Sequence, residues 1–581
     1  MIEKMHKYSF VLLTQEKDAF IKELQELGLV DISRSSKPVD EHSAALLGEC
    51  ERLRAEIADI EAGSDAHLRE LLEGIAQRRK EMEQIRPWGS WDREMLAATG
   101  LKPHFYKTDA KHFRQEWKEQ YALAKISEEK DGIRFVIIGD NAGFPLQELP
   151  EPEMDLKEAE RAVGLMEKEA EMYSAALEGR KAEVPALRKT LTSKREELSR
   201  YLASAEGVKA AEDKLTVFEG FAPVADAEKL KTALDKMPLV WFSEDANVSD
   251  APPIKLRNRK FAGLFEKLTD MYGRPSYDGF DPTPFISIFF TLFFAFCMGD
   301  AGYGLVILLL GALLKGKLGK STSALVMVLG AATLIIGTVF HSFFSLDMSK
   351  WGFVQTLGID KIMLPSSKLA VPGLGEYDWA MMLALACGVL HICIAQLTKA
   401  AIATRNAGLV KSLGTWGWTI LILGGVAIGV FSLLGVLEKS GVKIAIIAVG
   451  ALSALLIFFL RDLKKNPLLN FGAGLWESYN TATGLLSDVL SYLRLYALGL
   501  AGSLLGSAFN DLAVMVRGDG GFGWVFFVLL LIVGHTLNIA MAGLGAFVHP
   551  LRLNFLEFFK NSNYEGSGRK FSPLAKENTN N

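Results

Sequence analysis

One arginine lies inside a run of apolar residues, where a charge is costly. Arg494 stands in the segment SYLRLYALGLAGSL and is the only Lys or Arg between Lys465 and Arg517. A guanidinium stays protonated in proteins, so this residue cannot lose its charge to suit hydrocarbon. An arginine at mid-membrane costs about 3 kcal/mol on insertion scales and above about 10 kcal/mol in simulations. Either value predicts a functional residue that faces protein or water.

Polar side chains accompany Arg494 on its own predicted span and on the span that follows. Ser487, Ser491 and Arg494 share one helix face because they are four and three residues apart. Asp488 precedes Arg494 by six residues, so it points away and is not expected to be its direct partner. The next span carries a polar stripe at intervals of three and four residues that ends at Arg552. The positions that could line an ion path are Glu477, Thr481, Ser487, Asp488, Ser491, His535, Asn538 and His549.

Most of these residues also have a purely structural explanation. A lone Ser or Thr in a helix usually hydrogen-bonds to a carbonyl of the preceding turn. For His535 and Asn538, hydrogen bonding between helices explains the polarity as well as ion conduction does. Arg552 alone could be an interface anchor that snorkels to water. Arg494 has no such alternative, since neither flank of its segment offers a short route to water.

Two long spans with one arginine each and few carboxylates indicate a surface along an ion path rather than a site that encloses a bound ion. A fixed positive charge at low dielectric favours ionisation of a carboxylate that approaches it. The same charge blocks an ion from passing straight through. The pattern predicts a device in which a moving carboxylate must release its ion when it meets the arginine.

Charge divides the chain into a soluble part and a membrane part. The first 280 residues carry 43 Lys and Arg and 53 Asp and Glu, whereas the remaining 301 residues carry only 21 and 15. The opening MIEKMHKYSF lacks the features of a signal peptide, so we expect the first part to be cytoplasmic. The four cysteines have neither metal nor disulfide spacing, and we expect no metal site and no cofactor.

The first 280 residues predict a cytoplasmic arm of four parts. Two similar strand–helix–strand patterns predict one inner α+β lobe. Between them, apolar residues at heptad spacing predict a coiled-coil hairpin, although charged helices folded onto a globular core are the alternative. A proline-bounded segment predicts an outer lobe at the tip of the hairpin. The parts are the inner lobe 1–40 with 210–250, the coiled coil 41–86 with 152–206, the outer lobe 87–150 and the linker 251–280.

The rest of the chain predicts a transmembrane domain over residues 281–560 and a loose cytoplasmic tail over 561–581. The fold class is therefore mostly α, with α+β lobes on a coiled-coil hairpin followed by eight transmembrane helices. Lys and Arg gather in alternate short loops and in the tail, which predicts that both termini are cytoplasmic. The seventh span is long enough to need a strong tilt. The predicted spans are 283–298, 301–314, 323–344, 379–397, 414–437, 442–460, 479–512 and 522–549.

Four sequence blocks in this order resemble the membrane-embedded stator subunit of V/A-type rotary ATPases, called subunit a or subunit I. They are RPSYDGFDPTPF, MGDAGYG, SYLRLYALGLA and HPLRLNFLEFF. The resemblance implies that Arg494 faces the ion-binding glutamate of a rotating ring of c or K subunits, supported by Arg552. It also implies two offset aqueous half-channels against that ring. The implied partners are the ring, peripheral-stalk subunits of E/G type, central rotor subunits of d/C type and membrane lipid, but no nucleic acid.

Two positions depart from the eukaryotic pattern of that family. Gly502 stands where the pattern has histidine, and Ala542 stands where it has glutamate. The lining of the ion path must therefore differ here, with Glu477 and Asp488 as candidate replacements. The shorter chain favours the plasma membrane of a bacterium or archaeon.

The chain is not expected to be an ATPase by itself. Its only near match to a P-loop ends in Gly319, Lys320 and Ser321, but Leu314 occupies the first glycine position. The main hypothesis is a non-catalytic, ion-translocating stator subunit. A secondary transporter with a cytoplasmic regulatory domain is the alternative, which would predict an internal repeat. A structural membrane tether is the third interpretation, and it gives no reason to bury Arg494.

Overall fold

The computed structural model describes the chain in ranges separated by short gaps. The chain forms two compact units, one from residues 1–11, 29–31 and 219–573 and the other from residues 12–28, 32–218 and 574–581. Most described residues are helical, as predicted, and the strands are few. The described ranges are 1–34, 37–89, 100–109, 111–129, 132–150, 156–356, 358, 361–365, 368–371, 375–436, 438–460, 467–517 and 521–576.

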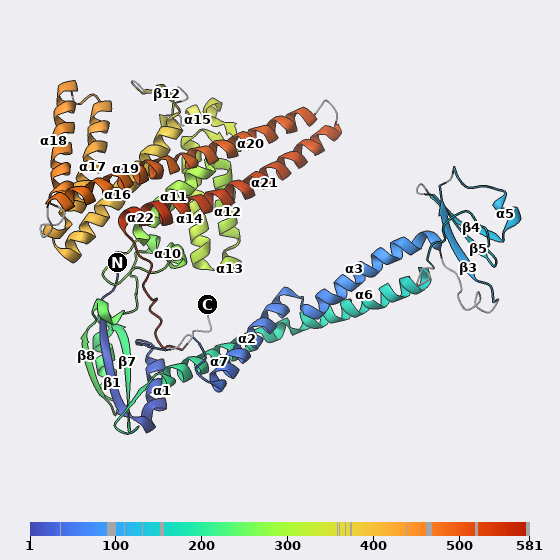
Figure 1. The fold of residues 1–581 in the computed structure, drawn as a ribbon, viewed down its shortest axis with the longest axis horizontal. Coiled ribbons are helices and arrows are strands. Elements are labelled where there is room, and N and C mark those ends of the chain that lie inside the picture. The colour runs from blue at the N-terminus through green and yellow to red at the C-terminus, as the bar shows by residue number, and fades with distance from the viewer. Residues whose placement is uncertain are drawn as a thin grey trace. The chain divides into compact units, whose positions relative to one another are not determined.

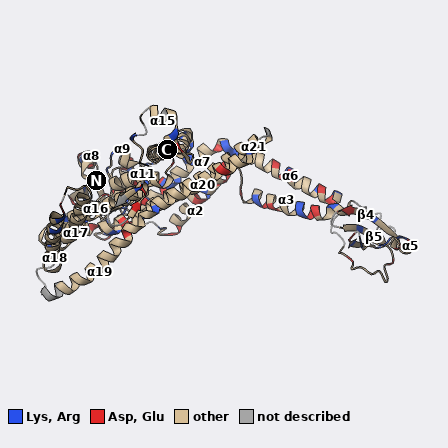
Figure 2. Ribbon diagram, turned by 90° about the horizontal axis from the view of Figure 1, so that it is seen from above, with Lys and Arg blue, Asp and Glu red and all other residues tan. Residues whose placement is uncertain are grey.

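The second unit is built on two pairs of long helices (Figure 1). Helix α2 (Glu41–Ala62) packs against α7 (Val184–Ala205), and α3 (Ala66–Ile85) packs against α6 (Leu156–Gly179). Acidic and basic residues follow one another along α3 and α6 (Figure 2). Buried apolar residues form a seam within these helix pairs, while the coiled coil itself stays a prediction. The buried seam includes Cys50, Ile57, Ile60, Leu68, Ile75, Val163, Leu177 and Leu191.

Both helical segments of this hairpin, the outgoing one and the returning one, are interrupted. Gly63 ends α2 with φ of +62°, and the Asp65 side chain accepts the Leu68 N–H at 2.8 Å to start α3. On the return path, a 3-10 turn over Arg180–Glu183 separates α6 from α7. Pro185 lies in the first turn of α7, where its missing N–H has no helical partner to lose.

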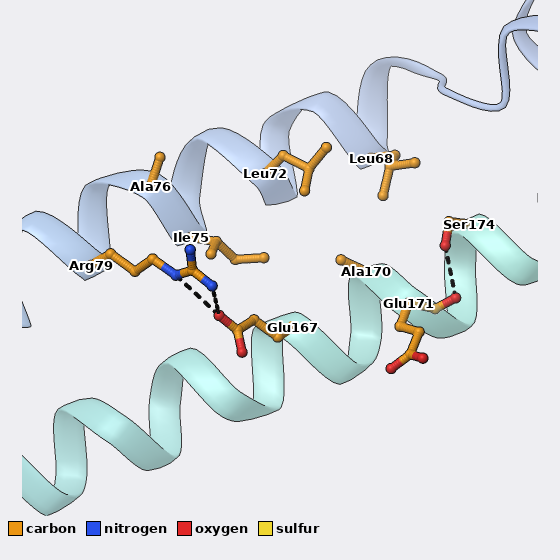
Figure 3. Close-up of a pocket in the computed structure, with 9 residues that line it drawn as sticks. All are labelled: Leu68, Leu72, Ile75, Ala76, Arg79, Glu167, Ala170, Glu171 and Ser174. Carbon is orange, nitrogen blue, oxygen red and sulfur yellow. Dashed lines mark hydrogen bonds and ion pairs between the residues drawn. The ribbon is translucent and has the colours of Figure 1, made fainter. Parts of the chain in front are cut away.

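A cavity of about 660 Å³ opens between α3 and α6 (Figure 3). Arg79 and Glu167 form an ion pair across it at 2.6 Å. A mixed lining with a satisfied ion pair indicates a gap in the packing of two helices. The residues that line it are Leu68, Leu72, Ile75, Ala76, Arg79, Glu167, Ala170, Glu171 and Ser174.

A small antiparallel sheet follows the outer ends of α3 and α6. Its strand order is β3–β5–β4, and the central strand β5 is buried almost throughout. The bulge between Lys125 and Ser127 shifts the register of β4 on β5. The core is aromatic, with Tyr106, Trp117 and Phe135 at its centre. The strands are β3 (Pro103–Thr108), β4 (Leu123–Glu129) and β5 (Gly132–Ile138).

The two predicted strand–helix–strand patterns supply one five-stranded sheet. Its order is β2–β7–β1–β8, with β6 paired to β7. Strands β1 and β8 are antiparallel, with His6 opposite Asp245 and Val11 opposite Val240. The elements are β1 (Met5–Leu13), α1 (Lys17–Leu27), β2 (Asp31–Ile32), β6 (Val208–Ala210), β7 (Leu215–Pro223), α8 (Ala227–Leu234) and β8 (Val240–Asp245).

Apolar helices make up the larger part of the first unit. Within the described residues, six are long and apolar enough to cross a membrane, and two shorter apolar helices precede them, so the count of eight spans stays a prediction. The last two long spans are the predicted pair that carries Arg494 and Arg552. The helices are α11 (Thr283–Met298), α12 (Ala301–Leu313), α14 (Lys320–Val339), α16 (Trp379–Ala407), α17 (Leu413–Leu433), α18 (Lys439–Phe458), α19 (Pro467–Ser491), α20 (Leu493–Arg517) and α21 (Gly521–Arg552).

Glycines allow α12 and α14 to approach each other closely. A Cβ at Gly304 would lie 2.3 Å from the Leu334 nitrogen, and one at Gly330 would lie 2.5 Å from the Leu308 nitrogen. At Gly337 the nearest atom would be the Ala301 nitrogen at 2.1 Å. Because the opposing atoms belong to backbone, no side-chain movement can relieve the overlap. Membrane helices often associate through such small residues.

We expect Gly337→Ala to lower the thermal unfolding midpoint of the detergent-solubilised protein. Overpacking of this kind costs about 1–3 kcal/mol, because α12 and α14 must separate. Gly425→Ala is the matched control, since a Cβ added at Gly425 on helix α17 would meet no atom within 4 Å. An unchanged midpoint for Gly337→Ala would contradict the close approach of the two helices.

The segment after α21 is held in place, so the predicted loose tail is wrong for residues 561–574. The Tyr564 hydroxyl donates to the Gly273 carbonyl at 2.8 Å, and Leu574 is 1% exposed. The Lys570 ammonium lies 3.1 Å from Asp270. Burial raises the pKa of Asp270, but hydrogen bonds from Arg274 and Lys570 outweigh it, and the pKa is lowered overall. The ordering depends on contacts with the linker that are some 300 positions away in sequence, which local composition does not reveal.

Candidate functional site

A helix break positions Arg494. Helix α19 ends at Ser491 and α20 begins at Leu493, so the predicted long span consists of two helices that meet at Tyr492. The Tyr492 N–H donates to the Val489 carbonyl at 3.2 Å, three residues back rather than four. Arg494 therefore lies in the first turn after the break.

The Tyr492 ring fixes this break from a fully buried position. A Cβ at Gly388 on α16 would lie 2.3 Å from the Tyr492 Cγ, so only glycine leaves room for the ring. The Tyr492 hydroxyl lies 2.9 Å from His391 Nδ1, and both side chains are 0% exposed. Phe293 packs against both rings. Helix α16 thus supplies the packing site that holds the Tyr492 ring at the junction of α19 and α20.

The guanidinium of Arg494 is half-buried and unpaired. Its Nη1 atom is buried without a hydrogen-bond partner, and it forms no ion pair within the described residues. Its electrostatic neighbours include Cys297 at the end of α11 and His549 on α21. Arg552 is exposed, also influences His549, and likewise has no ion pair among the described residues. Two guanidinium groups that form no ion pair among the described residues therefore share one neighbourhood, where an external anion would be attracted strongly.

A polar network lies on the side of Arg494 toward α19. Asp488, 7% exposed, accepts hydrogen bonds from Lys560 Nζ at 3.1 and 3.2 Å and from Asn561 Nδ2 at 2.8 Å. The Asn561 carbonyl oxygen accepts from Gln396 Nε2 at 2.9 Å. As predicted, Asp488 does not pair with Arg494; its charge is balanced by Lys560.

A second polar network lies toward the C-terminal end of α20. His535 Nδ1 lies 2.8 Å from the Tyr303 hydroxyl, and its Nε2 lies 3.0 Å from Asn510 Oδ1. Asn538 Nδ2 donates to the Tyr303 hydroxyl and to the Gly502 carbonyl, each at 2.8 Å. The interhelical hydrogen bonding that the sequence offered for His535 and Asn538 is therefore present. These hydrogen bonds connect α12, α20 and α21 through one continuous set of polar groups.

The remaining predicted positions differ in their surroundings. Ser491 Oγ donates to the Ser487 carbonyl at 3.1 Å, which is the back-bonding expected for a helical serine. His549 Nδ1 is buried without a hydrogen-bond partner. Glu477 and Thr481 are half-buried on α19. Across the described residues, no group of three or more His, Cys, Asp or Glu could hold a metal ion.

Asp300 is a buried polar residue to which the sequence assigned no role. It is 2% exposed and accepts four hydrogen bonds, from the N–H groups of Tyr303, Phe344 and Ser345 and from the Ser342 hydroxyl, at 2.6–3.1 Å. It therefore caps α12 and holds the loop that follows α14. An aspartate directly before an apolar helix is the signal that could have identified the cap.

Comparison with known proteins bears on both arginines. The chain matches the V-type ATPase 116kDa subunit family over residues 166–346 and 482–576, and the second match contains Arg494 and Arg552. The chain belongs to this family.

Relatives of this subunit family come from archaea and bacteria. A-type ATP synthase subunit I of Methanocaldococcus jannaschii is 29% identical over 62% of this chain and 55% of its own length. The corresponding subunit I of Pyrococcus horikoshii is 31% identical over 61% and 53%. V-type ATP synthase subunit I of Chlamydia trachomatis is 24% identical over 98% of each chain. The matches to the first two span about half of those relatives, whereas the third spans nearly the whole protein.

Proposed function

We propose that this subunit I protein forms the stator side of the ion path in a V/A-type rotary ATPase. The half-buried guanidinium of Arg494 carries the proposal, because its Nη1 atom is buried without a hydrogen-bond partner. Leaving such a group without a partner is costly in a folded protein, which favours a partner carboxylate from another chain. A ring glutamate that passes Arg494 would ionise and release its ion.

The two polar networks support half-channels that are offset along the helix axis. Asp488 precedes Arg494 by six residues and Asn510 follows it by sixteen. At 1.5 Å per residue these separations are about 9 Å and about 24 Å. The Asp488 network would lead to the arginine from the inner side. The network of His535 and Asn538 would lead to it from the outer side. Gly502 supplies its backbone carbonyl to the outer network, at the position where the eukaryotic pattern has histidine.

Apolar side chains next to Arg494 suit contact with a rotating ring. Leu500 and Leu504 are exposed on α20. Met541, Leu544 and Val548 are exposed on α21, which packs beside α20 (Figure 1). A smooth apolar face around one fixed charge lets a partner slide without strong attachment. Arg552 would support Arg494 by adding a second positive charge at the same face.

The remaining features of the proposal follow from the family. The cytoplasmic arm would link peripheral-stalk subunits of E/G type and central rotor subunits of d/C type to the membrane sector. ATP chemistry would belong to partner subunits, and the ring site would select proton or sodium. We place the protein in the plasma membrane of a bacterium or archaeon, with both termini cytoplasmic.

Reconstitution tests the function. The complex is purified through a tag on this chain, placed in vesicles and supplied with ATP, and the uptake of protons and of sodium is followed. We expect uptake of one of these ions that requires both ATP and the partner subunits. Gradient-driven solute uptake by this chain alone would instead support the secondary-transporter alternative.

A further inference from the structure

Four acidic side chains of the membrane half are at least nine-tenths buried among the described residues. Three of them have hydrogen-bond donors: Asp281 accepts from the Thr283 N–H, and Asp300 and Asp488 accept as described above. The fourth is Glu557, which is 4% exposed and whose Oε2 atom has no hydrogen-bond partner. An unsatisfied buried carboxylate oxygen is costly, so the three partnered acids look structural and Glu557 does not.

The backbone around Glu557 is unusual. A π-helix over Leu553–Phe558 follows directly after Arg552 at the end of α21. Asn554 Nδ2 donates to the Pro550 carbonyl at 2.8 Å, a carbonyl near the start of this wide turn. Single π-helical turns occur frequently at functional sites because they redirect side chains. Here the turn accompanies the placement of an acidic side chain in the core.

The neighbours of Glu557 connect it with Arg494. The Ser491 hydroxyl, which donates to the Ser487 carbonyl, lies near the Glu557 carboxylate, and Arg552 and Asp488 interact with that carboxylate electrostatically. Ser491 lies on the helix face of Arg494, three residues before it. The junction of α19 and α20 adds the Tyr492 hydroxyl.

Other elements pack against the π-helix with few titratable groups. Helix α16 supplies His391, whose ring stacks on Phe558 at 4.7 Å, and the short helix α22 (Phe559–Ser562) supplies Lys560, which is paired with Asp488. Helix α11 has no Asp, Glu, His, Lys or Arg. Glu557 is thus a buried acid beside the Ser491 face of the helix junction, and it forms no ion pair with a Lys or Arg of the described residues.

We propose that Glu557 is the proton-transfer group between the inner aqueous side and the ring carboxylate opposite Arg494. The Glu557 carboxylate takes a proton from inner water and then passes it through the Ser491 hydroxyl to the ionised ring carboxylate, which becomes neutral. Glu557 returns to its ionised form, and the reverse sequence operates when the ring turns the other way. This inference rests on the proposed stator function and commits the ion to a proton.

The experiment uses the assembled complex in vesicles and measures ATP-driven proton uptake across a range of pH. The variants are Glu557→Gln and Glu557→Asp, with Glu565→Gln as the matched control because Glu565 is exposed eight residues further on. We expect Glu557→Gln to lower the initial rate about tenfold or more, the scale of a lost proton-transfer group. Glu557→Asp should recover part of the rate with a displaced pH profile, and Glu565→Gln should match the wild type.

Arg494→Ala in the same assay separates this inference from the proposed function. Loss of uptake in Arg494→Ala together with a wild-type rate and pH profile in Glu557→Gln would overturn the role of Glu557 alone. Uptake near wild type in Arg494→Ala would overturn the stator function itself. Uptake of sodium without protons would exclude the proton-transfer role. If Glu557→Gln fails to assemble, an unchanged pH profile in Glu557→Asp would still contradict the proposal.

Discussion

Replacing Arg494 with alanine is expected to abolish ATP-driven ion uptake while the complex still assembles. The guanidinium would lower the pKa of an approaching ring carboxylate by about 1–3 units, so its removal should slow ion release by about 10- to 1,000-fold. Assembly should survive, because Arg494 forms no ion pair among the described residues and its Nη1 atom has no hydrogen bond to lose. The measurement is initial uptake into vesicles at fixed ATP, with ATP hydrolysis and subunit content determined on the same preparation.

Arg517→Ala is the control for this prediction. Arg517 ends the same helix, is exposed, and lies over the Trp524 ring at 5.1 Å. Its removal takes away one positive charge from α20 without touching the helix break at Tyr492. We expect wild-type uptake in this variant. Equal losses in both variants would mean that the overall charge of α20 matters and that Arg494 has no special part in ion release.

Local sequence patterns predicted the elements that depend on local order. The two strand–helix–strand patterns of the inner lobe contain the helices Lys17–Leu27 and Ala227–Leu234. The membrane helices likewise follow from apolar composition, and Arg494 and Arg552 were identifiable as charges in apolar surroundings. These features are decided by residues within one or two turns of each other.

The helix break next to Arg494 could not be predicted in this way. No proline or glycine stands next to Tyr492, so the local sequence favours one continuous helix. The break depends on the space that Gly388 leaves and on the bond to His391, which are about 100 positions away in the chain. The sequence analysis did not single out Glu557 for a related reason. The sequence after Arg552 predicts an ordinary α-helix and gives no sign of the π-helix that accompanies the burial of Glu557.

Asp300→Ala is expected to destabilise the membrane domain by about 3–5 kcal/mol and to prevent assembly of the complex. The carboxylate accepts four hydrogen bonds in a buried site, and bonds to a charged group are worth about 1.5–3 kcal/mol each before relaxation. The loop that it holds is strained, because Phe344 and Ser345 have φ of +48° and +59°. Such conformations cost about 1–3 kcal/mol each and persist only where the surroundings enforce them.

Two further variants test whether the effect comes from the buried carboxylate. Asp347 lies on the same loop and caps a short 3-10 turn over Met348–Lys350, but its side chain is 48% exposed. Asp347→Ala should therefore change the thermal unfolding midpoint little, since water can replace its lost bonds. Asp300→Asn keeps the shape but turns one acceptor oxygen into a donor that faces backbone N–H groups, so we expect it to resemble Asp300→Ala more than the wild type. A folded, assembled Asp300→Ala complex that has lost only ion uptake would contradict the structural role and place Asp300 in the ion path itself.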